Sequence, residues 1–181
     1  MKDYILEVRK LISPKLCEKI IQYFDKDYND AGTVGTGIDK NVRNCLTRSL
    51  QKPKTFGEKI CSNFVKEKIF NCVVHYQKKH HIDIQKISQL DILRYDTNKF
   101  KAGYNFHNDF GNNVNERHLS ISISLNNKYE GGEFVFDLPD GHYIIPQNVG
   151  DAVIFPSNFM FSHQVNKITK GTRFALIGWV I

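Results

Sequence analysis

The sequence predicts an α+β protein that is mainly β, with two N-terminal helices followed by a sandwich or jelly roll of short strands. Apolar residues recur at helical spacing before residue 80. From about residue 88 the chain changes to short apolar segments bounded by Gly, Pro, Asn or Asp, which is typical of strands. A length of 181 residues, with 41% hydrophobic and 24% charged residues, suits a single domain over 1–181 whose core needs no disulfides.

The N-terminal third is expected to contain one strand and both helices. Residues 3–12 alternate loosely between apolar and polar side chains and predict a strand. Ser13-Pro14 predicts a helix start, because serine is a favoured N-cap and proline is tolerated at the first helical position. A longer helix is predicted to begin near Pro53 and to end in the solvated basic segment Lys78-Lys79-His80-His81. Its predicted core-facing stripe is Phe56, Ile60, Phe64, Ile69, Val73 and Tyr76.

Turn sequences divide the remainder of the chain into strands that could form two packed sheets. The turns contain Asn126-Asn127, Gly131-Gly132, Asp140-Gly141 and Val149-Gly150. The strands are expected at 89–95, 104–109, 118–125, 133–137, 142–145, 151–155, 159–165 and 172–180. The two helices could then cover one face of this assembly.

Two of these predicted strands show which of their faces is apolar. In 118–125 the three serines share one side, and the apolar residues between them share the other. The apolar side should pack against helices or a second sheet, whereas the serine side could line a polar cavity. In 172–180, Arg173 and Trp179 share a face. That face suits either an ordinary strand edge or a pocket that needs one fixed cation and one aromatic wall.

A candidate metal site begins with His107 and Asp109, which are separated by one residue. In an extended segment both side chains point to the same face, where an imidazole and a carboxylate can chelate a metal. A third ligand should come from farther along the chain. His163 is well placed to supply it, with His118 and His142 as alternatives. Two histidines and one carboxylate form the facial triad that binds non-haem Fe(II) and leaves further positions open.

Composition and charge argue against several other classes of protein. The net charge of +6 comes mostly from dispersed lysines, and no basic stripe with interleaved aromatic residues supports nucleic-acid binding. No apolar run is long enough to span a bilayer, and no apolar segment near Met1 resembles a signal peptide. We therefore expect a cytoplasmic protein without a membrane partner. The four cysteines form no CxxC pair and are expected to be reduced thiols.

An ordered set of short motifs runs through the C-terminal half of the chain. It comprises Tyr104-x-x-His107-x-Asp109, Arg117-x-x-Ser120, Leu125-Asn126, Gly131-Gly132-Glu133, Gly150-Asp151, Ile154-Phe155-Pro156, His163, Gly171-x-Arg173 and Trp179. This set resembles the Fe(II)- and 2-oxoglutarate-dependent dioxygenases, specifically their prolyl 4-hydroxylase-like branch. Several fixed motifs in one order rarely coincide by chance. The resemblance implies a double-stranded β-helix, or jelly roll, with the N-terminal helices packed on one sheet.

The resemblance also implies the residues that carry the chemistry. His107, Asp109 and His163 match the Fe(II) ligands of the family, and Arg173 matches the basic residue that holds the far carboxylate of 2-oxoglutarate. A guanidinium suits this role because it pairs with a carboxylate through two parallel hydrogen bonds. These four residues are the predicted catalytic set.

Four further residues are implied to line the cosubstrate site. Tyr95 and Tyr104 match tyrosines of the cosubstrate pocket, and Trp179 matches an aromatic residue near the iron. Ser124 stands where some prolyl hydroxylases have a tyrosine on the strand that faces the cosubstrate. A serine leaves a roomier pocket and a shorter hydroxyl, so we expect the hydrogen bonding of 2-oxoglutarate to differ here.

The activity implied by the resemblance is hydroxylation of an unactivated C–H bond. It uses Fe(II), O2 and 2-oxoglutarate, with ascorbate as an optional reductant, and it releases succinate and CO2. The leading substrate prediction is a prolyl residue in a peptide or protein, with specificity set by the loops at 28–50, 96–103 and 110–117. The alternatives are a small-molecule hydroxylase of the same superfamily and a non-catalytic, cupin-like metal-binding module.

Overall fold

Two antiparallel sheets and two α-helices make up the part of the chain that the computed structural model describes, residues 1–31, 38–97, 102–110 and 117–181. The larger sheet contains, in spatial order, β1 (Leu6–Val8), β11 (Ala152–Pro156), β7 (Leu119–Ser124), β13 (Ile168–Val180), β5 (Ile87–Asp96), β4 (Leu46–Ser49) and β2 (Asn29–Asp30), and β8 (Tyr129–Gly131) also pairs with β13. The smaller sheet contains β10 (Gly141–Ile145), β9 (Phe134–Leu138), β12 (His163–Val165), β6 (Gly103–His107) and β3 (Arg43–Asn44).

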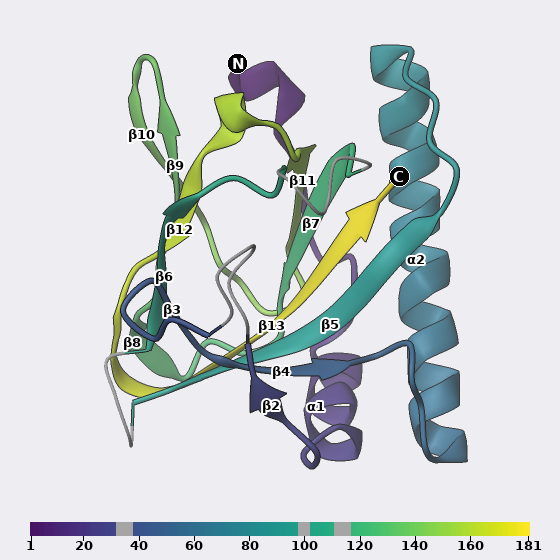
Figure 1. The fold of residues 1–181 in the computed structure, drawn as a ribbon. Coiled ribbons are helices and arrows are strands. Elements are labelled where there is room, and N and C mark those ends of the chain that lie inside the picture. Colours follow the sequence, from purple (N-terminus) through teal and green to yellow (C-terminus); the bar gives the residue numbers. More distant parts are fainter. Residues whose placement is uncertain (32–37, 98–101, 111–116) are drawn as a thin grey trace.

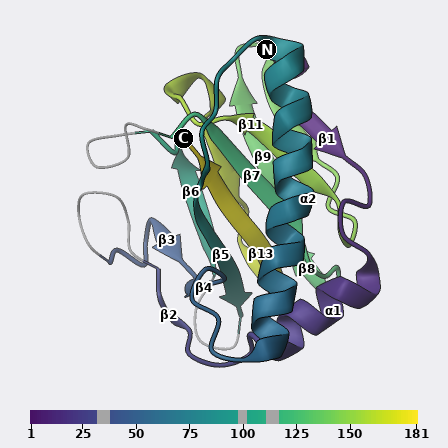
Figure 2. The same ribbon diagram turned by 90° about the vertical axis from the view of Figure 1, so that its right-hand side faces the viewer.

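The chain crosses repeatedly between these sheets from β5 onward. Strands β5, β7, β11 and β13 belong to the larger sheet, whereas β6, β9, β10 and β12 belong to the smaller one (Figure 1). Both helices lie on the outer face of the larger sheet (Figure 2). The fold is therefore a double-stranded β-helix with helices packed on one sheet, as predicted.

Most predicted strands are present, with shifted ends. The strand expected at 3–12 is reduced to β1, preceded by the short 3-10 helix η1 (Lys2–Tyr4). The strand expected at 159–165 is reduced to β12, because Phe159–Phe161 forms a second 3-10 helix, η2, capped by the side chain of Asn158. Short strands β2, β3, β4 and β8 were not predicted, because two to four residues show no clear alternation.

Local sequence signals account for both helix starts. Helix α1 (Pro14–Tyr23) begins after Ser13, whose hydroxyl accepts a hydrogen bond from the Leu16 backbone N–H at 3.3 Å. Helix α2 (Phe56–His80) begins with a capping box between Thr55 and Glu58, slightly later than predicted. In the described part of the chain, no helix is both long enough and apolar enough to cross a membrane.

The predicted core face of α2 is correct in its C-terminal half and wrong in its N-terminal half. Residues from Ile69 onward in the predicted stripe are buried, whereas Phe56, Ile60 and Phe64 are 79%, 53% and 41% exposed. Phe64 and Ile69 are five residues apart, and this spacing rotates one from the other by about 140° around the helix. They cannot share a face, and Val65, four residues before Ile69, is buried instead.

Two apolar cores result from this layering, one between the helices and the larger sheet and one between the two sheets. Strand β7 contributes Leu119, Ile121 and Ile123 to the helix-side core. The three serines that alternate with them are also buried, on the face directed toward the smaller sheet. This confirms the predicted division of the strand and places its polar face between the sheets.

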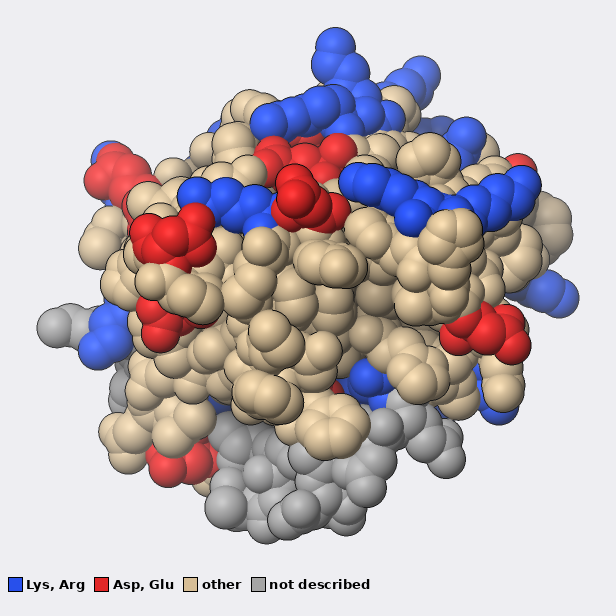
Figure 3. Space-filling model, turned by 90° about the horizontal axis from the view of Figure 1, so that it is seen from above, with Lys and Arg blue, Asp and Glu red and all other residues tan. Residues whose placement is uncertain are grey.

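The surface seen from above separates charged from uncharged side chains. Basic and acidic residues lie interspersed toward the edges of this face, and its middle is largely uncharged (Figure 3). The net charge of +6 is therefore not gathered into one basic patch on this side of the molecule.

Candidate metal and cosubstrate site

Three side chains converge between the two sheets at the ends of β6 and β12. His107 ends β6, His163 begins β12, and these residues lie opposite each other in the antiparallel pair. Asp109 follows β6 by two residues. Its Oδ1 lies 3.8 Å from His107 Nε2, and its Oδ2 lies 3.7 Å from His163 Nε2. One donor atom from each residue lies within 4.8 Å of the others, close enough for one metal ion to contact all three.

Backbone carbonyls orient both imidazole rings toward this common point. His107 Nδ1 donates to the Asn105 carbonyl at 2.8 Å, and His163 Nδ1 donates to the Phe161 carbonyl at 3.0 Å. Because a carbonyl can only accept, each ring carries its proton on Nδ1 and directs the Nε2 lone pair toward Asp109. The pKa of His107 is lowered to about 3, mainly by burial and to a smaller extent by the nearby His163. This keeps the ring neutral and able to bind a metal.

A hydrogen-bonded serine pair holds the Asp109 carboxylate. Ser120 Oγ donates to Asp109 Oδ2 at 2.5 Å and lies 2.9 Å from Ser157 Oγ. Burial alone would raise the pKa of Asp109, but the two histidines and Ser120 outweigh it, and the pKa is lowered. The Trp179 N–H adds to this lowering, although Nε1 has no partner within hydrogen-bond geometry among the described residues. An ionised carboxylate and two imidazoles form a donor set that fits Fe(II).

Arg173 lies in the same inter-sheet space and has no acidic partner among the described residues. Its side chain is 1% exposed, and its guanidinium lies 5.2 Å from the Tyr95 ring centroid. Nη2 donates to Gln147 Oε1 at 2.7 Å, whereas Nε and Nη1 are buried without a hydrogen-bond partner in the described part of the chain. A buried cation is costly without an anion. These unpaired N–H groups therefore fit the carboxylate of a bound ligand.

Aromatic rings and arginines form the walls beside the triad. The Tyr104 ring stacks on His107 with centroids 3.4 Å apart and an interplanar angle of 15°. Arg117 stacks on Trp179, with its guanidinium carbon 3.7 Å from the ring centroid. As bounded by the described residues, a cavity of about 220 Å³ is lined by Tyr104, Asp109, Arg117 and Trp179, and also by Arg43.

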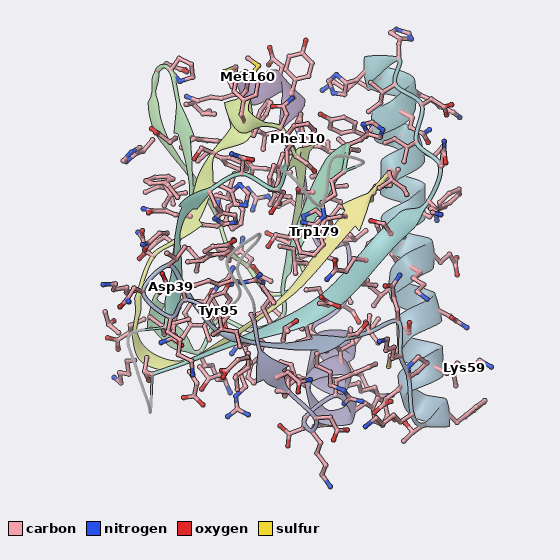
Figure 4. All side chains as sticks on the ribbon, in the orientation of Figure 1. Asp39, Lys59, Tyr95, Phe110, Met160 and Trp179 are labelled. Atoms are coloured by element: carbon pink, nitrogen blue, oxygen red, sulfur yellow. The ribbon has the colours of Figure 1, made fainter. Side chains whose placement is uncertain are left out.

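The structure brings Tyr95 and Ser124 close to Arg173, whereas Trp179 lies six positions farther along β13, beside Asp109 and Arg117. Tyr95 lies opposite Arg173 in the β5–β13 pair, and Tyr95 and Trp179 both lie between the sheets, on the side away from α2 (Figure 4). Ser124 donates to Gln147 Oε1 at 3.1 Å, the same atom that accepts from Arg173. The serine face of β7 thus lines a polar site, as the sequence suggested.

Two of the candidate histidines lie elsewhere. His142 is exposed on β10, with its Nε2 3.5 Å from Asp137 Oδ1. His118 lines a separate surface cavity beside Tyr76 and His80. Neither joins His107 and Asp109 in the cluster found among the described residues.

Several residues of the site carried no signal in the sequence reasoning. Gln147 lies in the segment between β10 and β11, outside every motif, although its amide contacts both Ser124 and Arg173. Ser157 was also missed. It belongs to the site because its backbone carbonyl accepts a hydrogen bond from the Asp109 N–H at 3.1 Å. The loops expected to set specificity are only partly described: 32–37, 98–101 and 111–116 lie outside the described residues.

Comparison with known proteins agrees with the fold and the donor set. Residues 90–181 match the family model of the 2OG-Fe(II) oxygenase superfamily, which covers half of the chain. The chain belongs to this superfamily. Family membership implies Fe(II), 2-oxoglutarate and O2 as the reactive partners, and the His-Asp-His cluster and Arg173 are consistent with them.

Curated relatives match over a shorter segment. A PKHD-type hydroxylase of Psychrobacter sp. (strain PRwf-1) is 44% identical over 64 residues, covering 34% of this chain and 24% of that protein. A PKHD-type hydroxylase of Colwellia psychrerythraea is 37% identical over 85 residues, covering 44% of this chain and 37% of that protein. The matched segments therefore span well under half of these relatives.

Solved structures share the fold over nearly the whole chain. A prolyl-4-hydroxylase of Pseudomonas putida has a TM-score of 0.77 at 17% identity, covering 97% of this chain and 91% of that one. A prolyl hydroxylase of Trichoplax adhaerens, in complex with a hypoxia inducible factor peptide fragment, has a TM-score of 0.79 at 14% identity, covering 98% and 83%. At these identities the likeness is one of fold.

Proposed function

We propose that this protein is an Fe(II)- and 2-oxoglutarate-dependent dioxygenase that hydroxylates a prolyl residue in a peptide or protein. The observation that carries the proposal is a His-Asp-His cluster that shares one inter-sheet space with a buried arginine. Asp109 and His163 are buried, and the arginine has no acidic partner among the described residues. The cluster fits an iron ion, and the arginine fits the far carboxylate of a dicarboxylate cosubstrate.

In this proposal His107, Asp109 and His163 hold the iron, and Arg173 binds 2-oxoglutarate. The bound iron and cosubstrate supply the oxidising chemistry, with succinate and CO2 as products. The chain's own residues position and shield them. Ser120 fixes the carboxylate of Asp109, and the two backbone carbonyls fix the imidazoles. Three fixed protein ligands would leave further positions on the ion for exchangeable partners.

Tyr95, Tyr104, Ser124 and Trp179 complete the proposed cosubstrate site. Burial raises the pKa of Tyr95 and of Tyr104, so both phenols stay protonated and can donate hydrogen bonds. The Tyr104 ring, which stacks on His107, also restricts the rotation of that imidazole. Trp179 forms part of the cavity wall next to Asp109.

The surroundings of the site favour a peptide over a free metabolite. The cavity of about 220 Å³ is smaller than the roughly 300–1,000 Å³ typical of small-molecule sites, and it suits one side chain of a larger substrate. Phe110, next to Asp109, and Met160 are 46% and 48% exposed, and both lie above the site (Figure 4). These two exposed side chains offer apolar contacts to a polypeptide, and the middle of the face seen in Figure 3 presents few charges to it.

The test begins with anaerobic addition of Fe(II) and then 2-oxoglutarate. We expect the visible charge-transfer band of a chelated keto acid, followed on exposure to O2 by succinate release and a mass increase of one oxygen on proline-containing peptides. Peptides with alanine in place of proline are the matched control. A band without peptide oxidation, together with oxidation of a low-mass metabolite, would identify a small-molecule hydroxylase. Iron binding without a band would identify a cupin-like binding module.

A further inference from the structure

The side chain of Gln147 accepts hydrogen bonds from the donors that are proposed to bind the carboxylate of the cosubstrate. Its Oε1 accepts two hydrogen bonds, one from Arg173 Nη2 at 2.7 Å and one from Ser124 Oγ at 3.1 Å. A carboxylate oxygen bound at this place would accept from the same two donors. The amide oxygen is therefore a neutral substitute for one oxygen of the ligand's carboxylate.

The amide oxygen of Gln147 replaces a ligand carboxylate only in part, and this difference matters for cosubstrate binding. Among the described residues, Arg173 Nε and Nη1 remain buried without hydrogen-bond partners, and no acidic side chain pairs with the guanidinium. A carboxylate brings a second oxygen and a full negative charge, which strengthens hydrogen bonds to a guanidinium. A dicarboxylate can thus displace the Gln147 oxygen, although it must first break two hydrogen bonds.

The surroundings give Gln147 a place to move. It is half-buried and lines an open surface cavity of about 230 Å³, together with Tyr129, Gly132 and Glu133. Gly132 has a φ of +71°, and a Cβ there would lie 2.2 Å from Ile168 Cδ1 and 3.1 Å from Arg173 Cδ. The wall beside the arginine is therefore backbone, and the amide of Gln147 lies between the guanidinium and this cavity.

We infer that Gln147 occupies the donors of Arg173 and Ser124 before cosubstrate arrives and competes with the distal carboxylate of 2-oxoglutarate for them. Gln147 Oε1 connects Ser124 to Arg173 by accepting a hydrogen bond from each. The residue at 147 therefore sets how readily a dicarboxylate is bound. This inference rests on the proposed function.

Two substitutions of Gln147 have opposite expected effects. Gln147→Glu places a permanent carboxylate on Arg173, so the ligand-free protein should melt at a higher temperature and 2-oxoglutarate should bind at least about tenfold more weakly. Gln147→Ala removes the competing acceptor, so the ligand-free protein should melt at a lower temperature and 2-oxoglutarate should bind several-fold more tightly. Both variants should bind Mn(II) like the unmodified protein, because neither change touches the triad.

The measurements are thermal denaturation without ligand and anaerobic titration of the Mn(II)-loaded protein with 2-oxoglutarate. Gln22→Glu, an exposed glutamine on α1, is the control for added charge. Equal weakening of 2-oxoglutarate binding by both Gln147 variants, or wild-type affinity in Gln147→Glu, would overturn the inference while leaving the proposed function intact. A wild-type protein that binds Mn(II) but no 2-oxoglutarate would instead refute the proposed function.

Discussion

At the residue scale, each member of the His-Asp-His cluster is held by a partner that contributes nothing to the metal directly. The imidazoles donate to carbonyls two residues earlier in the chain, and Asp109 accepts from Ser120. Such partners fix the direction of a donor atom before any ion binds. Metal binding can therefore be weakened in two distinguishable ways. One is to remove a side chain that donates to the metal, and the other is to remove the hydrogen bond that holds such a side chain in place.

Removing a donor should abolish metal binding. We expect His163→Ala to lose high-affinity Fe(II) and Mn(II) binding, because only two of the three converging donors remain. His142→Ala is the matched control, since His142 is exposed and lies away from the cluster. Metal titration monitored by electron paramagnetic resonance of Mn(II) measures both. Wild-type affinity in His163→Ala would overturn the ligand assignment.

Releasing a donor should have a smaller effect. Ser120→Ala leaves Asp109 in place without its 2.5 Å hydrogen bond, and loss of such a partner typically weakens metal binding about 10–100-fold. Ser122→Ala is the control, because Ser122 lies on the same buried face of β7. The same Mn(II) titration applies. If Ser120→Ala and Ser122→Ala weakened binding equally, Ser120 would have no specific role toward Asp109.

At the element scale, one buried ion pair joins β4 to the start of α2. Arg48 Nη2 lies 2.9 Å from Glu58 Oε1, both side chains are 5% exposed, and the guanidinium lies over the Phe24 ring. Glu58 is also the capping-box residue of α2. Burial alone would raise the pKa of Glu58, but hydrogen bonds from the Lys54 backbone, Arg48 and the Thr55 backbone together lower it.

The lowered pKa of Glu58 predicts a stability that depends on pH. Its contribution is fully present above the ordinary value of 4.5 and is lost as pH falls through the lower folded-state value. Glu58→Gln should cost on the order of 3 kcal/mol at pH 7, because Arg48 keeps a buried, uncompensated charge. Urea denaturation across pH 3–7 measures this, and the difference from wild type should shrink at low pH. The exposed pair Lys54–Asp27 is the control, so Asp27→Asn should change stability far less.

The elements also show where sequence reasoning succeeds and where it stops. Alternation along a strand was sufficient to place Arg173 on the face of Trp179, because that prediction needs only the period of a strand. His107 and Asp109 do lie together, but Asp109 follows the end of β6, so strand alternation alone does not account for their meeting. The stripe on α2 failed at Phe64 because two segments of helical spacing are out of phase across a five-residue gap.

Contacts that depend on the path of a loop could not be predicted from the sequence. Gln147 is 26 positions from Arg173 in the sequence, and only the return of the chain after β10 brings the two together. The carbonyls that orient the histidines belong to the backbone, which is the same for every residue type. Residue identity therefore predicts the ligands of the site more readily than the groups that hold them.

At the scale of the whole molecule, the proposed ligands connect the two sheets. The histidines belong to strands of the smaller sheet, whereas Arg173 belongs to β13 of the larger one. Iron chelated by 2-oxoglutarate would attach to the smaller sheet through the metal and to the larger sheet through the distal carboxylate. Binding should then stabilise the assembly of both sheets and not only the local site.

This arrangement predicts two separable increments of thermal stability. Mn(II) alone should raise the melting temperature, and 2-oxoglutarate should add a second rise only when Mn(II) is present. At a ligand concentration of about 100 times Kd, each step should contribute about 2.7 kcal/mol. Arg173→Ala should keep the first increment and lose most of the second, whereas His163→Ala should lose both. Differential scanning fluorimetry with succinate as a control dicarboxylate measures them. A full second increment in Arg173→Ala would mean that the cosubstrate does not reach the larger sheet through this residue, and the guanidinium would then need another anion to account for its burial.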